Sequence, residues 1–316
     1  MCYSAMVEAD LREAEREYDA LIARKMFAHL FRRRVEDDYI KIPKAVELAF
    51  ENPRNAEEVE IKLSIDQYRA KKTRELELEL FKQKKRLGDA ERGLKTRVTK
   101  KAQNDQRIAT DKIEALVKRI GDVNRTERRE RDARIFPFHY APIVIDEGKG
   151  RQIIPARYHC RPFGKPEFLD KQFDGLYNAR RDSLEKFWKD LFGRHHAVCP
   201  MTSFYENVAL HRFDHRELRP DEKERNVILH FNPRPAIRMH VACVWSRWSD
   251  DLVSFAAITD EPPPEIAAAG HDRVVIALKR ANVESWLSPT GVDRALLYKL
   301  FDDREAPYYE HQRIAA

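Results

Sequence analysis

Cys2 is the residue with the most distinctive chemistry in this sequence. It directly follows Met1, and an initiator methionine before a small second residue is usually removed. Without Met1, the α-amine and the thiol of Cys2 stand on adjacent carbons. Their ordinary pKa values lie near about 8 and about 8.5, so both groups supply nucleophile close to neutral pH. A 1,2-aminothiol attacks an aldehyde through nitrogen to give an imine, then closes through sulfur to a thiazolidine. The alternative is a cysteine that occupies the second position by chance.

The other reactive side chains form no comparable local motif. His195 and His196 lie close to Cys199, but a strand-like context and the lack of a second ligand pair argue against zinc. The four cysteines, Cys2, Cys160, Cys199 and Cys243, show no CxxC spacing, which favours a reducing cytoplasm over a disulfide scaffold. We therefore expect no metal ion and no cofactor.

Length and composition limit the class of protein. The chain has 316 residues, 35% of them charged, and a net charge of +6. At ~150 residues per domain this length favours two domains, and a mild basic excess is compatible with a polyanionic partner. No apolar run is long enough to span a bilayer, and the N-terminus lacks the apolar region of a signal peptide. We expect a cytoplasmic protein without a membrane partner.

Two regions of different amino-acid composition must position the cysteine. Residues from about 7 to 131 are rich in Glu, Lys and Arg and predict helices: a first amphipathic helix from Leu11 to Leu30, a long helix from near Ser64 to Thr99, and another that ends near Gly121. These favour a helical hairpin or a dimerising coiled coil. Basic side chains on this arm either are simply solvated or contact nucleic-acid phosphates; they are Lys84, Lys85, Arg86, Arg97, Lys100 and Lys101.

From Arg134 onward, short apolar stretches bounded by Pro and Gly predict strands. Strands are expected at residues 152–158, 196–205, 227–231, 239–248, 252–259 and 274–278. Short helices are expected at residues 181–192, 266–270, 283–287 and 292–301. Many short strands with few helices predict an α+β domain built on a β-barrel-like sheet.

Four short motifs occur in order: the N-terminal Met-Cys, Asn178-Ala-Arg180, the strand end Phe204-Tyr-Glu206, and Gly270-His-Asp-Arg273. Together they resemble the SOS response-associated peptidase family, whose members shield abasic sites in single-stranded DNA. The stretch Phe138-His-Tyr-Ala-Pro142 resembles a further segment of that family. The chain departs from the family pattern where Tyr3-Ser4 replaces Gly-Arg and where Asn207 replaces a Trp after the glutamate.

The resemblance implies an α+β fold whose core is a mainly antiparallel, barrel-like sheet with short helices. The long coiled-coil-like arm is an insertion that is not part of the family's common core. Residues 1–6 would be the N-terminal strand of the core, residues 7–132 the inserted arm, and residues 133–316 the core domain. It also implies covalent capture of abasic sites through Cys2, autocatalytic removal of the preceding residue, and a weak abasic-site lyase activity. The partner would be single-stranded DNA in the nucleoid, and the arm would serve self-association or another partner.

Each motif residue then has an expected role. Glu206 suits proton exchange during imine formation if apolar surroundings raise its pKa. His271 would assist opening of the sugar ring and return a proton, and Asn178 would hold the cysteine amine or the sugar. Arg180 and Arg273 would bind flanking phosphates through their forked donors.

Two other functions stay open on the sequence alone. One is an N-terminal-nucleophile hydrolase that cleaves amides with Cys2 and has no DNA role. The other is a non-enzymatic adaptor that acts through the helical arm. Turnover of an external amide would favour the first, and function that survives Cys2→Ala but not loss of the arm would favour the second.

Overall fold

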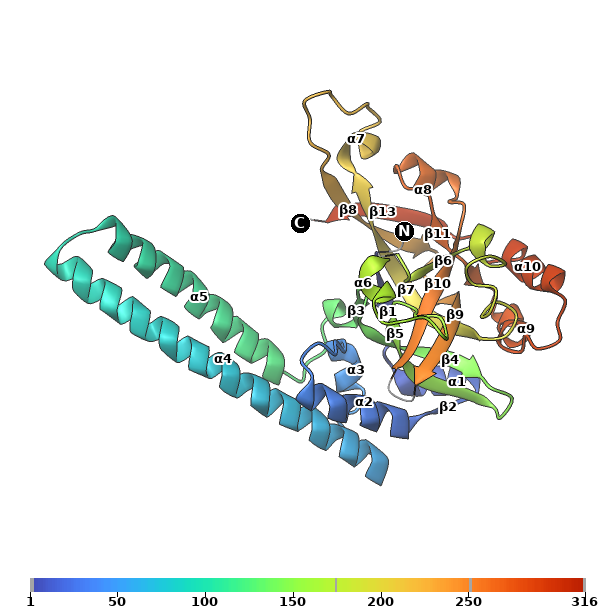
Figure 1. Cartoon of the computed structure of the whole chain (residues 1–316), viewed down its shortest axis with the longest axis horizontal. Helices are drawn as coiled ribbons and strands as arrows, with labels where there is room; N and C mark the ends of the chain where they lie inside the picture. The colour runs from blue at the N-terminus through green and yellow to red at the C-terminus, as the bar shows by residue number, and fades with distance from the viewer. Residues whose placement is uncertain (1–2, 174, 250–251, 315–316) are drawn as a thin grey trace. The chain divides into compact units, whose positions relative to one another are not determined.

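The computed structural model of the protein describes residues 3–173, 175–249 and 252–314 (Figure 1). These residues form two compact units. The β-rich unit comprises the described parts of 1–30, 39–49 and 128–316, and the helical unit comprises 31–38 and 50–127. The α+β class, the barrel-like sheet and the long helical arm are confirmed. None of the helices in the described residues is long and apolar enough to cross a membrane.

The strands are β1 (Ser4–Val7), β2 (Ala20–Ile22), β3 (Arg134–Ile135), β4 (Tyr140–Asp146), β5 (Arg151–Tyr158), β6 (Asn178–Arg180), β7 (His196–Ala209), β8 (Asn226–Arg234), β9 (Met239–Ser249), β10 (Leu252–Asp260), β11 (Val274–Val275), β12 (Ala277–Leu278) and β13 (Tyr308–Ile314). The helices are α1 (Leu11–Tyr18), α2 (Arg24–Glu36), α3 (Lys44–Leu48), α4 (Ala56–Thr96), α5 (Lys100–Asn124), α6 (Leu169–Gln172), α7 (Leu210–Phe213), α8 (Pro264–Ala268), α9 (Val283–Leu287) and α10 (Arg294–Asp302).

Five strands of the β-rich unit form a closed cycle of neighbours. Strand β7 pairs with β9 and with β4, β9 pairs with β10, β10 with β5, and β5 with β4. The β10–β5 pairing is parallel and the others are antiparallel. Closing the cycle pairs the backbone groups that would otherwise line an open edge. The core between the strands is apolar and includes the fully buried Ile143, Ile154, Val241 and Phe255.

Strand β1 joins this sheet between β3 and β7. Ser4 lies opposite Tyr205 of β7, and Ala5 lies between Phe204 of β7 and Ile135 of β3. All four residues of β1 are buried. Residues 4–7 are therefore an integral strand of the core.

The helical unit is dominated by the antiparallel pair α4 and α5 (Figure 1). Asn124 donates from Nδ2 to Thr73 Oγ1 at 2.9 Å near one end of the pair. Arg86 donates to Asp105 at 2.5 Å near the other end. Leu76 and Leu116 are buried between the helices. The expected hairpin is therefore present, with α4 beginning eight residues earlier than the sequence predicts.

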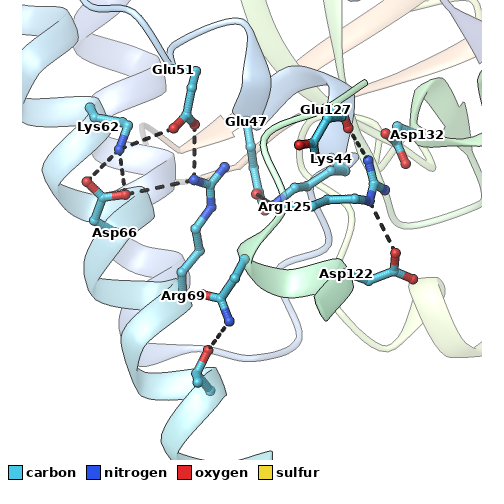
Figure 2. A network of polar contacts seen from close by, with 12 residues as sticks. Lys44, Glu47, Glu51, Lys62, Asp66, Arg69, Asp122, Arg125, Glu127 and Asp132 are labelled. Carbon is cyan, nitrogen blue, oxygen red and sulfur yellow. Dashed lines mark hydrogen bonds and ion pairs between the residues drawn. The ribbon is translucent and has the colours of Figure 1, made fainter. Parts of the chain in front are cut away.

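A polar network fastens the first turns of α4 to the segment that precedes it (Figure 2). Glu51 accepts a hydrogen bond from Arg69 Nη1 at 3.0 Å and lies 3.6 Å from Lys62 Nζ. Lys62 also pairs with Asp66 at 2.6 Å. Side chains of both signs thus neutralise one another at this end of α4.

The prediction of one amphipathic helix from Leu11 to Leu30 is wrong. Helix α1 ends at Tyr18, and the C-cap residue Asp19 has a left-handed backbone with φ of 47°. The chain then forms β2, which pairs in parallel with β5, before α2 begins. The apolar side chains recur at helical spacing both before and after β2, so their periodicity alone did not reveal that a strand separates two helices.

The helix expected at residues 181–192 is also wrong. A 3₁₀ turn at Arg181–Ser183 is followed by irregular turns. Backbone hydrogen bonds here span three, four or five residues, such as Leu191 N to Trp188 O and Trp188 N to Ser183 O. Leu184, Trp188 and Leu191 are nevertheless buried, so the apolar spacing correctly identified which side chains face the core.

Candidate functional site

The site begins where β1 meets the end of β7. The backbone N–H of Tyr3 donates to Glu206 Oε2 at 3.3 Å. Arg134 donates to Ser4 Oγ from Nε and Nη2, at 3.0 and 2.8 Å. Cys2, the expected nucleophile, lies outside the described residues and is joined to Tyr3 by one peptide bond. The described part of the N-terminal segment is thus anchored directly to a carboxyl group.

Glu206 is an unusual residue for a strand in a barrel wall. It is only 1% exposed and lies opposite Leu229 of β8. Burial raises the pKa of its carboxyl to about 8, and the hydrogen bond from Tyr3 opposes that rise. Because a buried carboxylate loses its hydration, the proton is retained at neutral pH. Glu206 is therefore a neutral acid that can deliver a proton.

His271 follows α8 and contacts this acid. Its Nε2 lies 3.3 Å from Glu206 Oε2, and burial lowers the pKa of the imidazole to about 4. Its Nδ1 lies 3.0 Å from Arg273 O and 3.3 Å from Arg273 N, so the ring has a backbone partner in either tautomer. With hydrogen on Nδ1, Nε2 accepts a hydrogen bond from the protonated Glu206 carboxyl. Since the pKa of Glu206 is raised to about 8 and that of His271 is lowered to about 4, the proton stays on the carboxyl and the imidazole orients it.

The loop before His271 is fixed by a close approach of backbone. Gly270 has φ of +87°, and a Cβ at this position would come within 3.0 Å of Arg212 Cβ and 3.1 Å of Val208 Cγ1. Only glycine adopts this conformation in so tight a space without strain. Gly270 thus holds the histidine against the end of β7.

A cleft of about 480 Å³ opens beside this pair, lined by Gly175, Asn178, Arg180, Asn207, Val208, Ala209, Arg212, Gly270, His271, Asp272 and Arg273. Asn178 comes from β6, which pairs in parallel with β10. Its side chain is 7% exposed, and neither amide atom has a hydrogen-bond partner among the described residues. Buried polar groups are nearly always satisfied. Asn178 therefore offers an unused donor and acceptor at the cleft wall.

Three arginines give the cleft a cationic lining. Arg180 is exposed, and Asp182 accepts from its Nε and Nη2 at 3.0 and 2.9 Å. Arg273 Nη2 lies 3.5 Å from Asp272. Arg212, which the sequence analysis missed, is exposed on α7 and makes no ion pair within the described chain. The stretch around Arg212 reads as a polar loop, so no periodicity marked it; only the fold turns it toward the other motifs.

The structure thus brings Asn178, Arg180, His271 and Arg273 to one cleft, with Glu206 in contact with His271. The direction of the pKa change that we expected for Glu206 is found, with burial as its cause. Tyr205, its neighbour, stacks on His230 at 4.1 Å and lies under the Arg134 guanidinium at 3.6 Å.

The histidines considered for metal binding have other partners. His196 Nε2 accepts from Gly193 N–H at 2.8 Å, and His196 Nδ1 contacts Trp286 O at 2.9 Å. The imidazole also stacks on the Trp286 ring at 3.6 Å. Within the described ranges, no group of three or more His, Cys, Asp or Glu side chains is arranged to hold a metal ion.

Comparison with known proteins identifies one family. A family model described as SOS response associated peptidase (SRAP) matches residues 97–315, more than half of the chain. The structure is also similar in part to two crystal structures from Bordetella bronchiseptica. One is a protein with 18% identity and a TM-score of 0.44, covering 58% of this chain and 88% of that one. The other is described as a phage-related protein, with 15% identity, a TM-score of 0.45, and coverage of 58% and 82%. No curated protein matches the sequence.

Proposed function

The chain belongs to the SOS response-associated peptidase family, and from this premise we propose that it captures abasic sites in single-stranded DNA covalently through Cys2. The observation that carries the proposal is the buried pair of Glu206 and His271, joined to the N-terminal strand by the hydrogen bond from Tyr3. The described end of the N-terminal strand is thereby joined to a neutral acid, which itself contacts a neutral imidazole.

The reaction requires a free α-amine, so Met1 must first be removed. The family description as a peptidase supports removal by the protein itself, with the Cys2 thiol attacking the preceding carbonyl. Cleavage of that amide transfers a proton to the departing amine of Cys2 and leaves Met1 as a thioester on the thiol. Water then hydrolyses the thioester, which releases methionine and restores the free thiol. Glu206 is suited to supply this proton because it is neutral at pH 7.

Capture follows from the open-chain form of the abasic sugar, which carries an aldehyde at C1′. The Cys2 nitrogen attacks C1′, and the carbonyl oxygen takes a proton from Glu206. The Glu206 carboxylate takes a proton from the attached nitrogen and gives it to the hydroxyl, which leaves as water and yields a protonated imine. The Cys2 thiol returns its proton to Glu206 as its sulfur adds to the imine carbon, and a neutral thiazolidine results. His271, a neutral imidazole in contact with Glu206, orients this carboxyl through the exchange.

The cleft suits a nucleic-acid strand around the reacting sugar. Asn178 offers a neutral donor and acceptor for the sugar hydroxyl, which adds no charge beside the aldehyde. Arg180, Arg212 and Arg273 supply forked donors for the flanking phosphates. An imine at C1′ also acidifies C2′, so a weak lyase reaction is expected wherever thiazolidine closure is slow.

Intact-protein mass spectrometry tests this proposal. The protein is weighed before and after incubation with a single-stranded oligonucleotide that carries one abasic site. We expect loss of Met1 and a stable one-to-one adduct in the wild type, and no adduct with Cys2→Ala. An undamaged oligonucleotide of the same sequence is the control.

Retention of Met1, or an adduct of equal yield with Cys2→Ala, would refute the proposal. Turnover of an external peptide without any DNA adduct would instead favour the hydrolase. Glu185→Gln provides a matched control for substitutions at Glu206, because Glu185 is a half-exposed carboxylate that lines no part of the cleft.

A further inference from the structure

The positive charge of the protein is concentrated at one end of the α4–α5 hairpin. We define the basic tip as residues 82–112, which comprise the end of α4, the connecting loop and the start of α5. It contains eleven Lys and Arg against four Asp and Glu, a net charge of +7, whereas the whole chain has +6. The rest of the protein is therefore close to neutral.

The hairpin holds this charge in a defined arrangement. The Arg86–Asp105 ion pair joins the two helices inside the tip, and Ala90 and Ala109 are buried between them. Seven basic side chains of the tip are exposed and make no ion pair within the described chain: Lys84, Lys85, Lys95, Arg97, Lys100, Lys101 and Lys112. The fold thus exposes a dense group of uncompensated cations.

The opposite end of the same helix shows that this excess is local. There, Lys72 contacts both Asp38 and Glu75 at 2.8 Å, and Lys62 pairs with Asp66. Basic residues on α4 are therefore matched by carboxylates near its beginning and are left unmatched toward its end.

The basic tip also breaks a local rule of helix stability. Lys100 and Lys101 occupy the first turn of α5, which contains no acidic residue. Cations there oppose the helix dipole, whereas acidic side chains would favour it. A sequence that breaks such a rule without a structural gain often does so for function.

We propose that the basic tip binds the sugar–phosphate backbone of DNA independently of sequence. The choice of DNA rests on the proposed function of the β-rich unit. The tip lacks the apolar surface stripe of a membrane-binding helix: Leu87, Leu94 and Ile108 are half-buried, and among its described large apolar residues Val98 alone is exposed. Exposed lysines on paired helices suit a row of phosphates, which bind such cations by releasing counterions.

Fluorescence anisotropy with an undamaged 25-base-pair duplex and the matching single strand tests this proposal between 50 and 200 mM salt. The test variant is the full-length protein with Lys84, Lys85, Lys100 and Lys101 replaced by Gln. The matched control replaces four exposed lysines of other surfaces, Lys25, Lys149, Lys189 and Lys299. Gln favours helix about as well as Lys does, and circular dichroism checks that both variants retain wild-type helicity.

Each phosphate contact contributes about 0.9 to the slope of log affinity against log salt on duplex DNA, and about 0.7 on a single strand. Loss of four contacts should make the duplex slope shallower by about 3.6 and weaken binding about tenfold or more at 100 mM salt. A tip variant that keeps the wild-type slope on both DNAs, or a control variant that loses as much as the tip variant, would overturn the proposal. The proposal would also be overturned if the four lysine substitutions weakened binding to anionic phospholipid vesicles but not binding to either DNA.

This experiment is separable from the test of covalent capture. Cys2→Ala should bind undamaged duplex with wild-type affinity, because the reaction is absent but the tip is intact. The tip variant should still form the adduct with a short abasic oligonucleotide at low salt. Adduct formation and backbone binding therefore report on the two proposals independently.

Discussion

Replacing Glu206 with Gln would remove the proton that the proposed capture reaction needs while leaving the shape of the side chain almost unchanged. Glu206 is buried, receives the Tyr3 N–H and lies 3.3 Å from His271 Nε2. An amide in its place can still accept from Tyr3 and contact the imidazole. It cannot act as an acid, so a change in rate would report on proton transfer and not on packing.

The magnitude follows from the pKa of Glu206, which burial raises to about 8. At pH 7 the acid then outnumbers the carboxylate by roughly tenfold, and above pH 8 the acid fraction falls about tenfold per pH unit. The Cys2 amine, by contrast, becomes more nucleophilic as pH rises toward about 8. The wild-type rate should therefore peak near pH 8. Glu206→Gln should slow capture at pH 7 by about 10²-fold or more, the usual contribution of a general acid.

The assay is single-turnover adduct formation between pH 6 and pH 10, resolved on denaturing gels. The Gln variant should lack the decline above pH 8, and Glu185→Gln should keep it. A Gln variant that retains both the wild-type rate and the alkaline decline would show that another group supplies the proton, and the mechanism derived from this pair would be wrong.

The raised pKa of Glu206 also predicts that the free energy of unfolding depends on pH, and that Glu206→Gln removes this dependence. The carboxyl pKa rises from 4.5 to about 8 on folding, so unfolding releases a proton between these pH values. The stability that this group contributes is complete below pH 4.5 and is lost as pH rises through 8, up to about 5 kcal/mol. Glu206→Gln should lack this loss. Urea unfolding at pH 5 and pH 9 checks it, and equal pH dependence in both proteins would contradict a neutral Glu206.

Three further substitutions test individual parts of the site. Gly270→Ala should lower the unfolding free energy by about 1–3 kcal/mol and slow capture, since its Cβ would collide with Arg212. Gly291→Ala is the control: Gly291 has φ of +78°, but no atom lies within 4 Å of the added Cβ. This variant should share the backbone strain and leave the capture rate unchanged. Equal capture rates for the Gly270 and Gly291 variants in adduct assays would refute the role of Gly270 in positioning His271. Asn178→Ala should reduce the capture rate about tenfold with little change in melting temperature, because its amide makes no hydrogen bond within the described residues. Asp182→Asn should free the Arg180 guanidinium and tighten binding of an undamaged single strand a few-fold, as anisotropy would measure; weaker binding would mean that the Asp182 contact positions Arg180 for phosphate.

Much of the fold is encoded in local patterns that the sequence reveals. Strands β5 and β7 to β10 follow runs of apolar and β-branched residues, and α4 follows a long stretch that is poor in glycine. The break between α1 and β2 is different, because it depends on the left-handed backbone of Asp19 and on pairing with β5. That pairing partner lies far along the chain, so no local window contains the information.

The candidate site shows the same limit. The motif residues Asn178, Glu206 and His271 can be recognised singly. Asn178 and His271 line one cleft, and His271 contacts Glu206, only because β6, β7 and the loop after α8 meet in three dimensions. Arg212 was missed because its neighbours carry no apolar period, and the engagement of Arg180 by Asp182 depends on side-chain geometry. The boundaries at 7 and 132 that we expected for the arm stay predictions.

The pairing of β1 with β7 has a consequence for the order of events during synthesis. Residues 4–7 pair with residues 201–205, so the N-terminal strand has no partner in β7 until about two hundred more residues have been added. At about 5–20 residues per second, that interval lasts some ~10–40 s. Contacts so distant in sequence form late, because closing the loop costs chain entropy before any pairing compensates it. Glu206 and His271 therefore cannot come into contact beside β1 until residue 271 has been synthesised and β7 has paired with β1.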